Sequence, residues 1–285
     1  MEIKASQVKE LRDMTGVAMM ECKKALVECE GNIEKALDLL RSNSALKAEK
    51  KAARVAADGV LKIFIGNGYA TLVEINSETD FAAKDANFVD FTNEVHDFIG
   101  KNKISDISQL HESEIEEKRK SLVQTIGENI QLRRLITKDF SADMNAGSYI
   151  HSDSKLGSVV IVSGGDESLA KDIAMHVAAF NPLCLSESDL DPEIIEREKA
   201  IYMVQAEESG KPKEIMEKMI EGKLKRFLSE VSLLSQGFVK DSEISIQELL
   251  DSKNAKIESY SRLKVGEGIE VESKSFADEV AEQLK

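Results

Sequence analysis

The four histidines, the three cysteines and the segment Ser209-Gly210-Lys211 are the features of this chain that come nearest to a catalytic or nucleotide-binding motif. No nucleophile and carboxylate gather in a recognisable motif near any of the four histidines, His96, His111, His151 and His176. Ser209-Gly210-Lys211 lacks the glycine that a phosphate-binding loop needs five positions before its second glycine. No C-x-x-C pair occurs among the three cysteines, Cys22, Cys29 and Cys184. We therefore expect structural or surface histidines, reduced cysteines, no cofactor or metal, and no enzymatic activity; a cryptic hydrolase is the weakest alternative.

The pair Asp80-Phe81 is the most informative feature of the chain. It follows a β-favouring stretch, residues 69–75, and precedes a helical pattern for which Asp85 is a candidate N-cap. An aromatic ring on a short acidic loop is suited to insertion into a partner, because aromatic anchors supply much of the energy of small contact sites. This pattern predicts an exposed tip.

A second interpretation of the same residues remains open. A helix that begins at Thr79 would place Phe81 and Phe88 on one buried face. Lys84 and Asp85 interrupt that apolar face, which favours the tip.

Length and charge exclude several classes of protein. The 285 residues indicate two or more domains, and a net charge of −14 argues against a nucleic-acid binder that depends on phosphate contacts. No apolar run approaches the ~20 residues that span a bilayer, and the first residues do not open a signal sequence. We expect a cytoplasmic protein that binds neither nucleic acid nor membrane.

Residues 1–54 are expected to form a helical bundle and its linker. Three short helices are predicted, and Gly16 and Gly31 lie where helices would end. Four basic residues then form a linker, for which a solvated connecting helix is the alternative: Lys47, Lys50, Lys51 and Arg54.

The middle of the chain predicts an α+β core built from two repeated hairpin-plus-helix subdomains, residues 55–140 and residues 141–181 with 229–264. Asn67-Gly68 marks the turn of the first hairpin. When Gly68 is matched with Gly157, the first copy is two residues longer before its helix, and the extra residues fall in the loop of Asp80 and Phe81. A loop lengthened in one copy favours a functional role.

Residues 182–228 read as an inserted antiparallel helical hairpin, marked by Pro182, Pro192 and Pro212. Its apolar residues could zip the two helices together, and its exposed end could bind another copy of the chain. The residues proposed to face one another are Ile194, Ile195, Ile201, Met203 and Val204 against Ile215, Met219 and Leu224. Ser245 to Glu248 forms a capping box, and residues 265–285 form a C-terminal module with one apolar helical face, Phe276, Val280 and Leu284.

Read together, these segments closely resemble the bacterial elongation factor Ts family, in its long form with a helical insertion. The resemblance covers essentially the whole chain in order. Its motifs are Lys9-Glu10-Leu11-Arg12, residues 15–26, residues 55–59, Thr79-Asp80-Phe81, residues 126–130, residues 175–179, residues 209–212 and residues 265–268.

The resemblance implies a guanine nucleotide exchange factor that binds elongation factor Tu carrying GDP and catalyses no bond chemistry. It would promote GDP release by disturbing the magnesium and phosphate site of the partner, and would itself need no cofactor. The bundle would be of the ubiquitin-associated type. The alternative is a helical protein-binding adaptor without exchange activity.

The resemblance also assigns site residues. Thr79, Asp80 and Phe81 would carry the exchange work, and the C-terminal helix would clasp the partner. The bundle residues that would contact the partner's nucleotide-binding domain are Lys9, Arg12, Met19 and Met20, and the supporting contact surface would include Ile126, Gly127 and His151.

Overall fold

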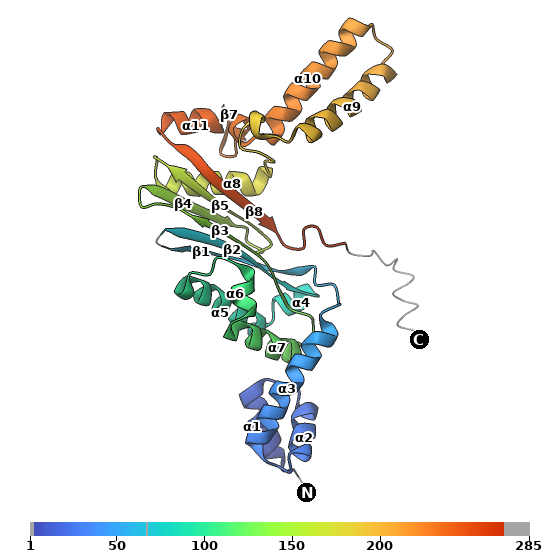
Figure 1. Ribbon diagram of the computed structural model, residues 1–285, viewed down its shortest axis with the longest axis vertical. Coiled ribbons are helices and arrows are strands. Elements are labelled where there is room, and N and C mark those ends of the chain that lie inside the picture. The colour runs from blue at the N-terminus through green and yellow to red at the C-terminus, as the bar shows by residue number, and fades with distance from the viewer. Residues whose placement is uncertain (1–2, 67, 271–285) are drawn as a thin grey trace.

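The computed structural model describes residues 3–66 and 68–270 and has a mixed α+β structure, as predicted. Two antiparallel sheets lie face to face in the middle of the molecule, with helices on their outer sides (Figure 1). Between the sheets lies a core cluster to which both contribute: Leu61, Ala70, Leu72, Ala146, Val159, Ile161 and Leu263. None of the helices in the described ranges has the length and apolarity needed to cross a membrane.

The N-terminal helices are α1 (Ala5–Thr15), α2 (Met19–Glu28) and α3 (Ile33–Lys51). Gly16 ends α1 in the left-handed region at φ 68°, and the Asn32 side chain caps α3 by accepting the Lys35 N–H at 2.9 Å. Leu11, Leu26 and Leu40 are among the residues of the small core between these helices.

Helix α3 is longer than expected, because it continues from this bundle into the body of the protein. Its residue Ala48 packs in the cluster beneath the first sheet. Lys47, Lys50 and Lys51 therefore lie on the last turns of α3, so these three residues belong to a connecting helix, the alternative given for the basic segment.

The first sheet has the strand order β1 (Asp58–Gly66), β2 (Tyr69–Ser77), β3 (Gln131–Asp139). The predicted β1–β2 hairpin is confirmed, with Gly66 opposite Tyr69, although Asn67 lies outside the described residues. The outer face of this sheet is covered by α5 (Ala86–Asn102), α6 (Ile107–His111) and α7 (Glu114–Ile126). Strand β3 and helices α6 and α7 were not predicted from the sequence.

The second sheet has the order β4 (Met144–Ile150), β5 (Leu156–Ser163), β8 (Lys256–Lys264), and α8 (Glu167–Phe180) packs on its outer face (Figure 1). A small ribbon of β6 (Gly237–Phe238) and β7 (Asp241–Ser245) leads into α11 (Ile246–Ser252). The predicted capping box is confirmed, since the Ser245 side chain accepts the Glu248 N–H and Glu248 accepts the Ser245 N–H.

The structure corrects the register of the internal repeat. The sheet bulges occur at Glu74/Ile75 in one half and at Ile161/Val162 in the other, and the helix N-caps that follow are Thr79 and Asp166. The number of residues between the bulge and the N-cap is the same in both halves. The first copy therefore has no extra residues before its helix, and the prediction of a lengthened loop is wrong because it matched Gly68 with Gly157 instead of matching the strands.

The two copies differ in the continuity of the helix. Helix α8 is continuous, whereas the equivalent stretch of the first half is broken into the single turn α4 (Asp80–Ala83) and the long helix α5. Asp85 caps α5, as predicted, by accepting the Asn87 N–H at 2.8 Å.

The inserted segment forms α9 (Pro192–Glu208) and α10 (Lys213–Val231), which project as a hairpin from the second half (Figure 1). The predicted apolar zipper is partly wrong, because Ile201, Met203, Val204 and Ile215 are exposed. Tyr202 and Ala206 occupy the inner side of α9 instead, since each helical residue is rotated ~100° from the one before it. The predicted helical face of Phe276, Val280 and Leu284 lies outside the described residues.

Candidate partner-binding site

Phe81 is an exposed tip. Its side chain is 82% exposed on α4, whereas Phe88 of α5 is completely buried. The helix ends at Ala83, so the two rings do not share a face, and the interpretation of one helix burying both rings is wrong. Ala82 and Ala83 are the residues of this turn that face the protein interior.

Thr79 fixes the turn that carries Phe81. Its Oγ1 accepts the Ala82 N–H at 3.2 Å, and its carbonyl accepts the Ala83 N–H at 3.2 Å and the Ser77 hydroxyl at 2.9 Å. Its own N–H and hydroxyl both donate to the Glu128 carboxylate, at 3.0 and 2.7 Å. Every backbone and side-chain polar group of Thr79 is therefore engaged.

A second carboxylate makes the reciprocal contact. Glu78 Oε1 accepts the Asn129 N–H at 2.6 Å and pairs with Arg54 at 3.6 Å. Each segment thus supplies a glutamate to a backbone N–H of the other segment. We call this arrangement, formed by residues 78–79 and 128–129, the glutamate clasp.

The clasp also touches the end of α3. The Asn129 side chain donates to the Arg54 carbonyl at 2.7 Å, and Lys51 donates to the Gly127 carbonyl. Gly127 ends α7 with φ 85°, a conformation that side chains rarely adopt, and so directs the chain into the clasp. The structure therefore brings Gly127 and its neighbour Ile126 close to the segment of Thr79, Asp80 and Phe81.

Asp80 carries the negative charge of the tip and pairs with Lys84 at 2.6 Å. The hydrogen bond from Lys84 lowers the pKa of the Asp80 carboxyl, and the positive charges of Lys84 and Lys155 act in the same direction. The same pair raises the pKa of Lys84. Asp80 is therefore ionised beside Phe81 and already has a cationic partner, Lys84, at the residue that follows its own helix.

His151 lies in the exposed turn between β4 and β5, where its Nδ1 is 3.2 Å from the Tyr149 hydroxyl. This turn docks on β1, since the Ser154 carbonyl accepts the Leu61 N–H at 2.8 Å and Lys155 pairs with Asp58 at 2.7 Å. The turn of His151 is thus fixed to β1, and the charge of Lys155 also acts on Asp80.

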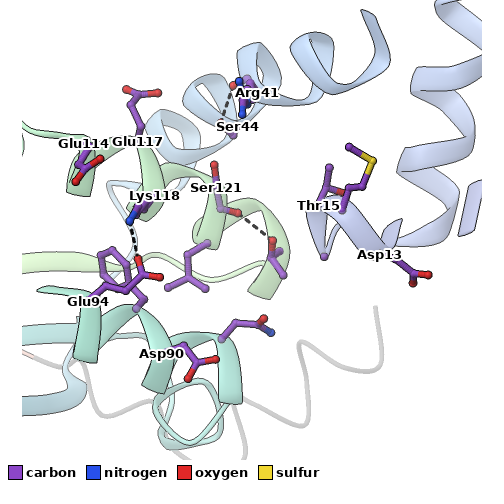
Figure 2. A pocket seen from close by; sticks show the side chains of 16 residues that line it. Asp13, Thr15, Arg41, Ser44, Asp90, Glu94, Glu114, Glu117, Lys118 and Ser121 are labelled. Carbon is purple, nitrogen blue, oxygen red and sulfur yellow. Dashed lines mark hydrogen bonds and ion pairs between the residues drawn. The ribbon is translucent and has the colours of Figure 1, made fainter. Parts of the chain in front are cut away.

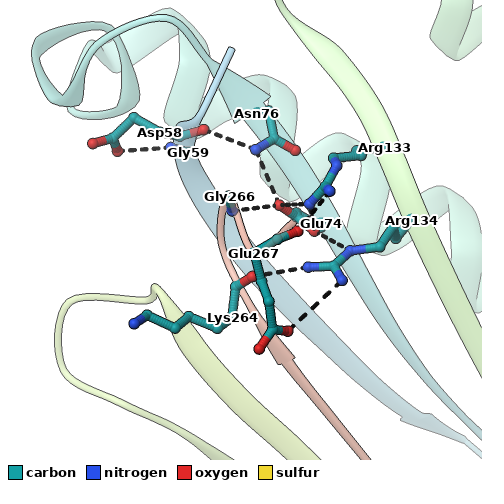
Figure 3. A network of polar contacts seen from close by, with 9 residues as sticks. All are labelled: Asp58, Gly59, Glu74, Asn76, Arg133, Arg134, Lys264, Gly266 and Glu267. Carbon is teal, nitrogen blue, oxygen red and sulfur yellow. Dashed lines mark hydrogen bonds and ion pairs between the residues drawn. The ribbon is translucent and has the colours of Figure 1, made fainter. Parts of the chain in front are cut away.

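Glu74 is the most buried charge near the site, with a fully buried side chain on β2. Its carboxylate accepts from Arg133 at 3.0 and 3.1 Å, Asn76 at 3.0 Å and the Gly266 N–H at 2.8 Å, and it also pairs with Arg134 (Figure 3). Burial alone raises the pKa of this carboxyl, but the hydrogen bonds from Gly266, Asn76 and Arg134 outweigh burial and hold the pKa below its usual 4.5.

The two arginines extend this cluster to the chain that follows β8. Arg133 donates to the Glu267 carbonyl at 2.7 Å and Arg134 donates to the Lys264 carbonyl at 2.8 Å. Gly266 has φ 74°, and a Cβ there would lie 2.3 Å from the Ala57 carbonyl oxygen. The cluster therefore fixes the segment leading to the C-terminal module against the first sheet.

The other predicted site residues lie on the bundle. Met19 and Met20 are 45% and 65% exposed at the start of α2, and Lys9 and Arg12 are exposed on α1. The structure does not bring these four residues together with Phe81: they lie on a separate group of helices that α3 connects to the core (Figure 1).

A groove of about 770 Å³ lies between the bundle and helices α5 and α7 (Figure 2). Acidic residues are prominent in its lining, and Lys118 pairs there with Glu94 at 3.0 Å. None of the predicted site residues lines it. This groove separates the bundle from the core and is not the site that the sequence indicates.

His176 has a structural role, in agreement with the interpretation of the histidines. It is buried, its Nδ1 accepts the Val239 N–H at 3.2 Å, and its Nε2 lies 3.0 Å from the Gln236 side-chain oxygen. Its ring stacks on Phe180 at 4.6 Å. Burial lowers its pKa, so the neutral ring joins α8 to the chain around β6.

The fold and the site first define a class: an α+β protein with an exposed aromatic ring on a fixed turn beside an ionised carboxylate, an arrangement suited to binding another protein. Comparisons with known proteins then identify the family. A family model described as "Elongation factor TS" matches residues 78–267. An elongation factor Ts from Hahella chejuensis (strain KCTC 2396) is 50% identical over 285 residues, covering 99% of each chain.

Other relatives agree over the same length. An elongation factor Ts from Francisella tularensis subsp. novicida (strain U112) is 48% identical, covering 99% of each chain. One from Pseudoalteromonas atlantica is 45% identical, covering 100% of this chain and 98% of the relative. The chain belongs to the elongation factor Ts family. It is a guanine nucleotide exchange factor for elongation factor Tu and serves translation elongation.

Sequence reasoning missed the residues that hold the tip in place. Four residues make contacts with the segment from Thr79 to Phe81 or with its immediate neighbours: Glu78, Lys84, Glu128 and Asn129. Residues 128 and 129 were noted as part of a family motif, but no local pattern relates them to a turn 49 positions away.

Proposed function

We propose that Phe81 acts as a wedge that drives GDP release from elongation factor Tu, and that Asp80 acts with it on the magnesium and phosphate surroundings of the nucleotide. The observation that supports this proposal is the 82% exposure of Phe81 on a turn whose capping residue has all its polar groups engaged. An isolated exposed phenylalanine on a fixed turn is suited to fill a pocket in a partner.

The energetics follow from linkage. If binding of this protein weakens the affinity of the partner for GDP by some factor, GDP weakens binding of this protein by the same factor. Each tenfold change requires ~1.4 kcal/mol of coupling. Only contacts that form better in the nucleotide-disturbed state contribute to coupling, and we assign Phe81 and Asp80 to this group.

The bundle has a different role in this proposal. Its exposed residues Lys9, Arg12, Met19 and Met20 contact the partner's nucleotide-binding domain equally in both states, which adds affinity without coupling. Ile126, Gly127 and His151 complete the contact surface around the tip, and the C-terminal module clasps the partner. The protein acts in the cytoplasm, on GDP and magnesium held by the partner, without a cofactor of its own.

The experiment is release of a fluorescent GDP analogue from elongation factor Tu, with wild type beside Phe81→Ala. We expect the variant to lower the maximal release rate much more than it weakens binding to nucleotide-free partner. Phe180→Leu is the control, because it removes another exposed ring, 50% accessible, from the second half and keeps an apolar side chain beside His176. Equal losses in rate and in affinity for Phe81→Ala would make Phe81 a plain adhesive contact.

Self-association through the inserted hairpin is a separate proposal. A hollow on one side of α9 and α10 is lined by the apolar Met203, Ile220 and Leu224, with Lys199 and two glutamates at its rim. Two copies related by a two-fold axis could place Lys199 of each against a glutamate of the other. Sedimentation of wild type and Met203→Glu tests this: a dimer that the variant abolishes supports the proposal, and a monomeric wild type contradicts it.

A further inference from the structure

The turn that carries Phe81 is too short to be stable alone. Helix α4 has four residues, and the first turn of a helix fixes several dihedral angles for a single hydrogen bond. The corresponding helix of the second half, α8, has 14 residues, a buried apolar face and a cap from Asp166, which accepts the Leu169 N–H at 2.8 Å. The shape of α4 must therefore come from contacts outside it.

Two of these contacts come from Glu128. Its two carboxylate oxygens take separate hydrogens of Thr79, the hydroxyl at 2.7 Å and the backbone N–H at 3.0 Å. Donation of the hydroxyl proton to Glu128 leaves the oxygen lone pairs of Thr79 free to accept the Ala82 N–H at 3.2 Å. One carboxylate thus orients both the backbone and the side chain of the residue that caps the turn.

We propose that Glu128 is a positioning residue for nucleotide exchange: through Thr79 it holds α4 in the orientation from which Phe81 enters the partner. This inference rests on the proposed role of Phe81. Glu128 acts through Thr79 and need not touch the partner. The carboxylate is half-buried and binds its own chain, so its effect falls on the orientation of the ring and not on the contact area.

Removal of the Glu128 carboxylate should make the orientation of Phe81 less fixed while leaving the ring in place. We expect Glu128→Ala to lower the maximal rate of GDP release about tenfold, equivalent to ~1.4 kcal/mol, while the concentration for half-maximal rate changes less than about twofold. Glu128→Gln keeps one acceptor oxygen, so its loss should lie between those of alanine and wild type. Thr79→Val, which deletes the hydroxyl at similar volume, should resemble Glu128→Ala, and Thr79→Ser should retain more activity than Thr79→Val.

The decisive measurement combines these changes with Phe81→Ala. A positioning role predicts that Glu128→Ala slows release in the wild-type background but adds nothing once the ring is gone. Equal fold losses in both backgrounds would overturn the inference, because Glu128 would then act independently of Phe81. A rise in half-saturation with an unchanged maximal rate would also overturn it, because Glu128 would then be a binding contact.

Two controls separate this inference from simpler effects. Glu112→Gln removes an exposed glutamate that makes no side-chain hydrogen bond or ion pair within residues 3–66 and 68–270, and it should exchange like wild type. Thermal unfolding shows whether Glu128→Ala still folds, and Glu128→Gln provides the test if it does not. The Phe81→Ala arm tests the wedge on its own: if that arm fails, the proposed mechanism fails, whereas loss in that arm with full activity of Glu128→Ala overturns only the present inference.

Discussion

The two halves of the core change from sheet to helix in the same way, but the helices that follow differ in length. In each half the middle strand carries a bulge, and a capping residue then starts a helix at an equivalent position. In the second half the helix continues for 14 residues, whereas in the first half it ends after a single turn and restarts at Asp85. Phe81 and Ser168 occupy equivalent outward positions, and both are exposed.

The difference shows how the same transition from strand to helix can produce either a packed helix or a short turn with an exposed ring. The second half stabilises its helix through length and a buried apolar face. In the first half the helix is interrupted, and the glutamate clasp holds the single turn α4 in place. The ring of Phe81 on this turn stays exposed. The middle strands of the two sheets also differ. The buried charged residue Glu74 of the first half lies at the position equivalent to the apolar Ile161 of the second half.

The largest effect we expect comes from the buried charge that distinguishes the two sheets. Glu74→Gln leaves Arg133 and Arg134 without their carboxylate, and breaking a buried ion pair costs about 3 kcal/mol or more. Chemical denaturation should show this loss of unfolding free energy. Ile161→Val at the equivalent position should cost only about 1 kcal/mol. A loss for Glu74→Gln as small as that for Ile161→Val would show that the arginines are not held by this carboxylate.

Acid should reveal the same asymmetry. Since the folded pKa of Glu74 lies below its usual 4.5, its contribution to stability is complete above about pH 4.5 and is lost as pH falls through the folded pKa. The free energy of unfolding should therefore fall more steeply below about pH 4.5 in wild type than in Glu74→Gln. Parallel curves for the two proteins would contradict the assignment.

An exchange of the outward residues tests the division of labour between the halves. Phe81→Ser gives the first half the residue of the second, and loss of an aromatic anchor worth about 2 kcal/mol should slow GDP release roughly thirtyfold. Ser168→Phe, added to Phe81→Ser, should not restore the rate of GDP release, because the helix of the second half has no break that would present the ring. Unfolding curves should be unchanged in both variants, since both positions are exposed. Recovery of exchange by Ser168→Phe would show that position alone is sufficient.

The smallest effect tests the break between α4 and α5. Asp85 and Asp172 are equivalent in sequence, but Asp85 caps α5 while Asp172 lies inside α8 and pairs with Lys240 at 2.6 Å. Asp85→Ala should cost about 1 kcal/mol of stability, as lost helix caps do, and Asp172→Ala about 0.5 kcal/mol or less, as lost surface pairs do. Equal costs would mean that the helix is not broken at Asp85.

Local patterns were sufficient for much of this architecture. The Gly66–Tyr69 hairpin, the cap at Asp85 and the capping box at Ser245 each depend on neighbouring residues, and all three were predicted. The exposure of Phe81 was also favoured, because Lys84 and Asp85 interrupt the apolar pattern that would have buried the ring.

The remaining features depend on contacts between distant residues. The clasp joins Thr79 to Glu128, and the Glu74 cluster joins strand β2 to Gly266, so no window of sequence contains both partners. The register of the repeat was misjudged because Gly68 and Gly157 look alike in sequence, while strand pairing decides the alignment. In the hairpin, Ile201 and Met203 fit an apolar pattern, but the line of contact between α9 and α10 passes through Tyr202 and Ala206.

Helix α3 has a further consequence for partner choice. One uninterrupted helix of 19 residues, about 28 Å long, packs in the bundle through Leu40 and in the core through Ala48. This helix sets the separation between the methionines of α2 and the ring of Phe81. Under the proposed contacts of Met19, Met20 and Phe81, two binding sites on the partner would have to match this separation as well as the chemistry of the residues.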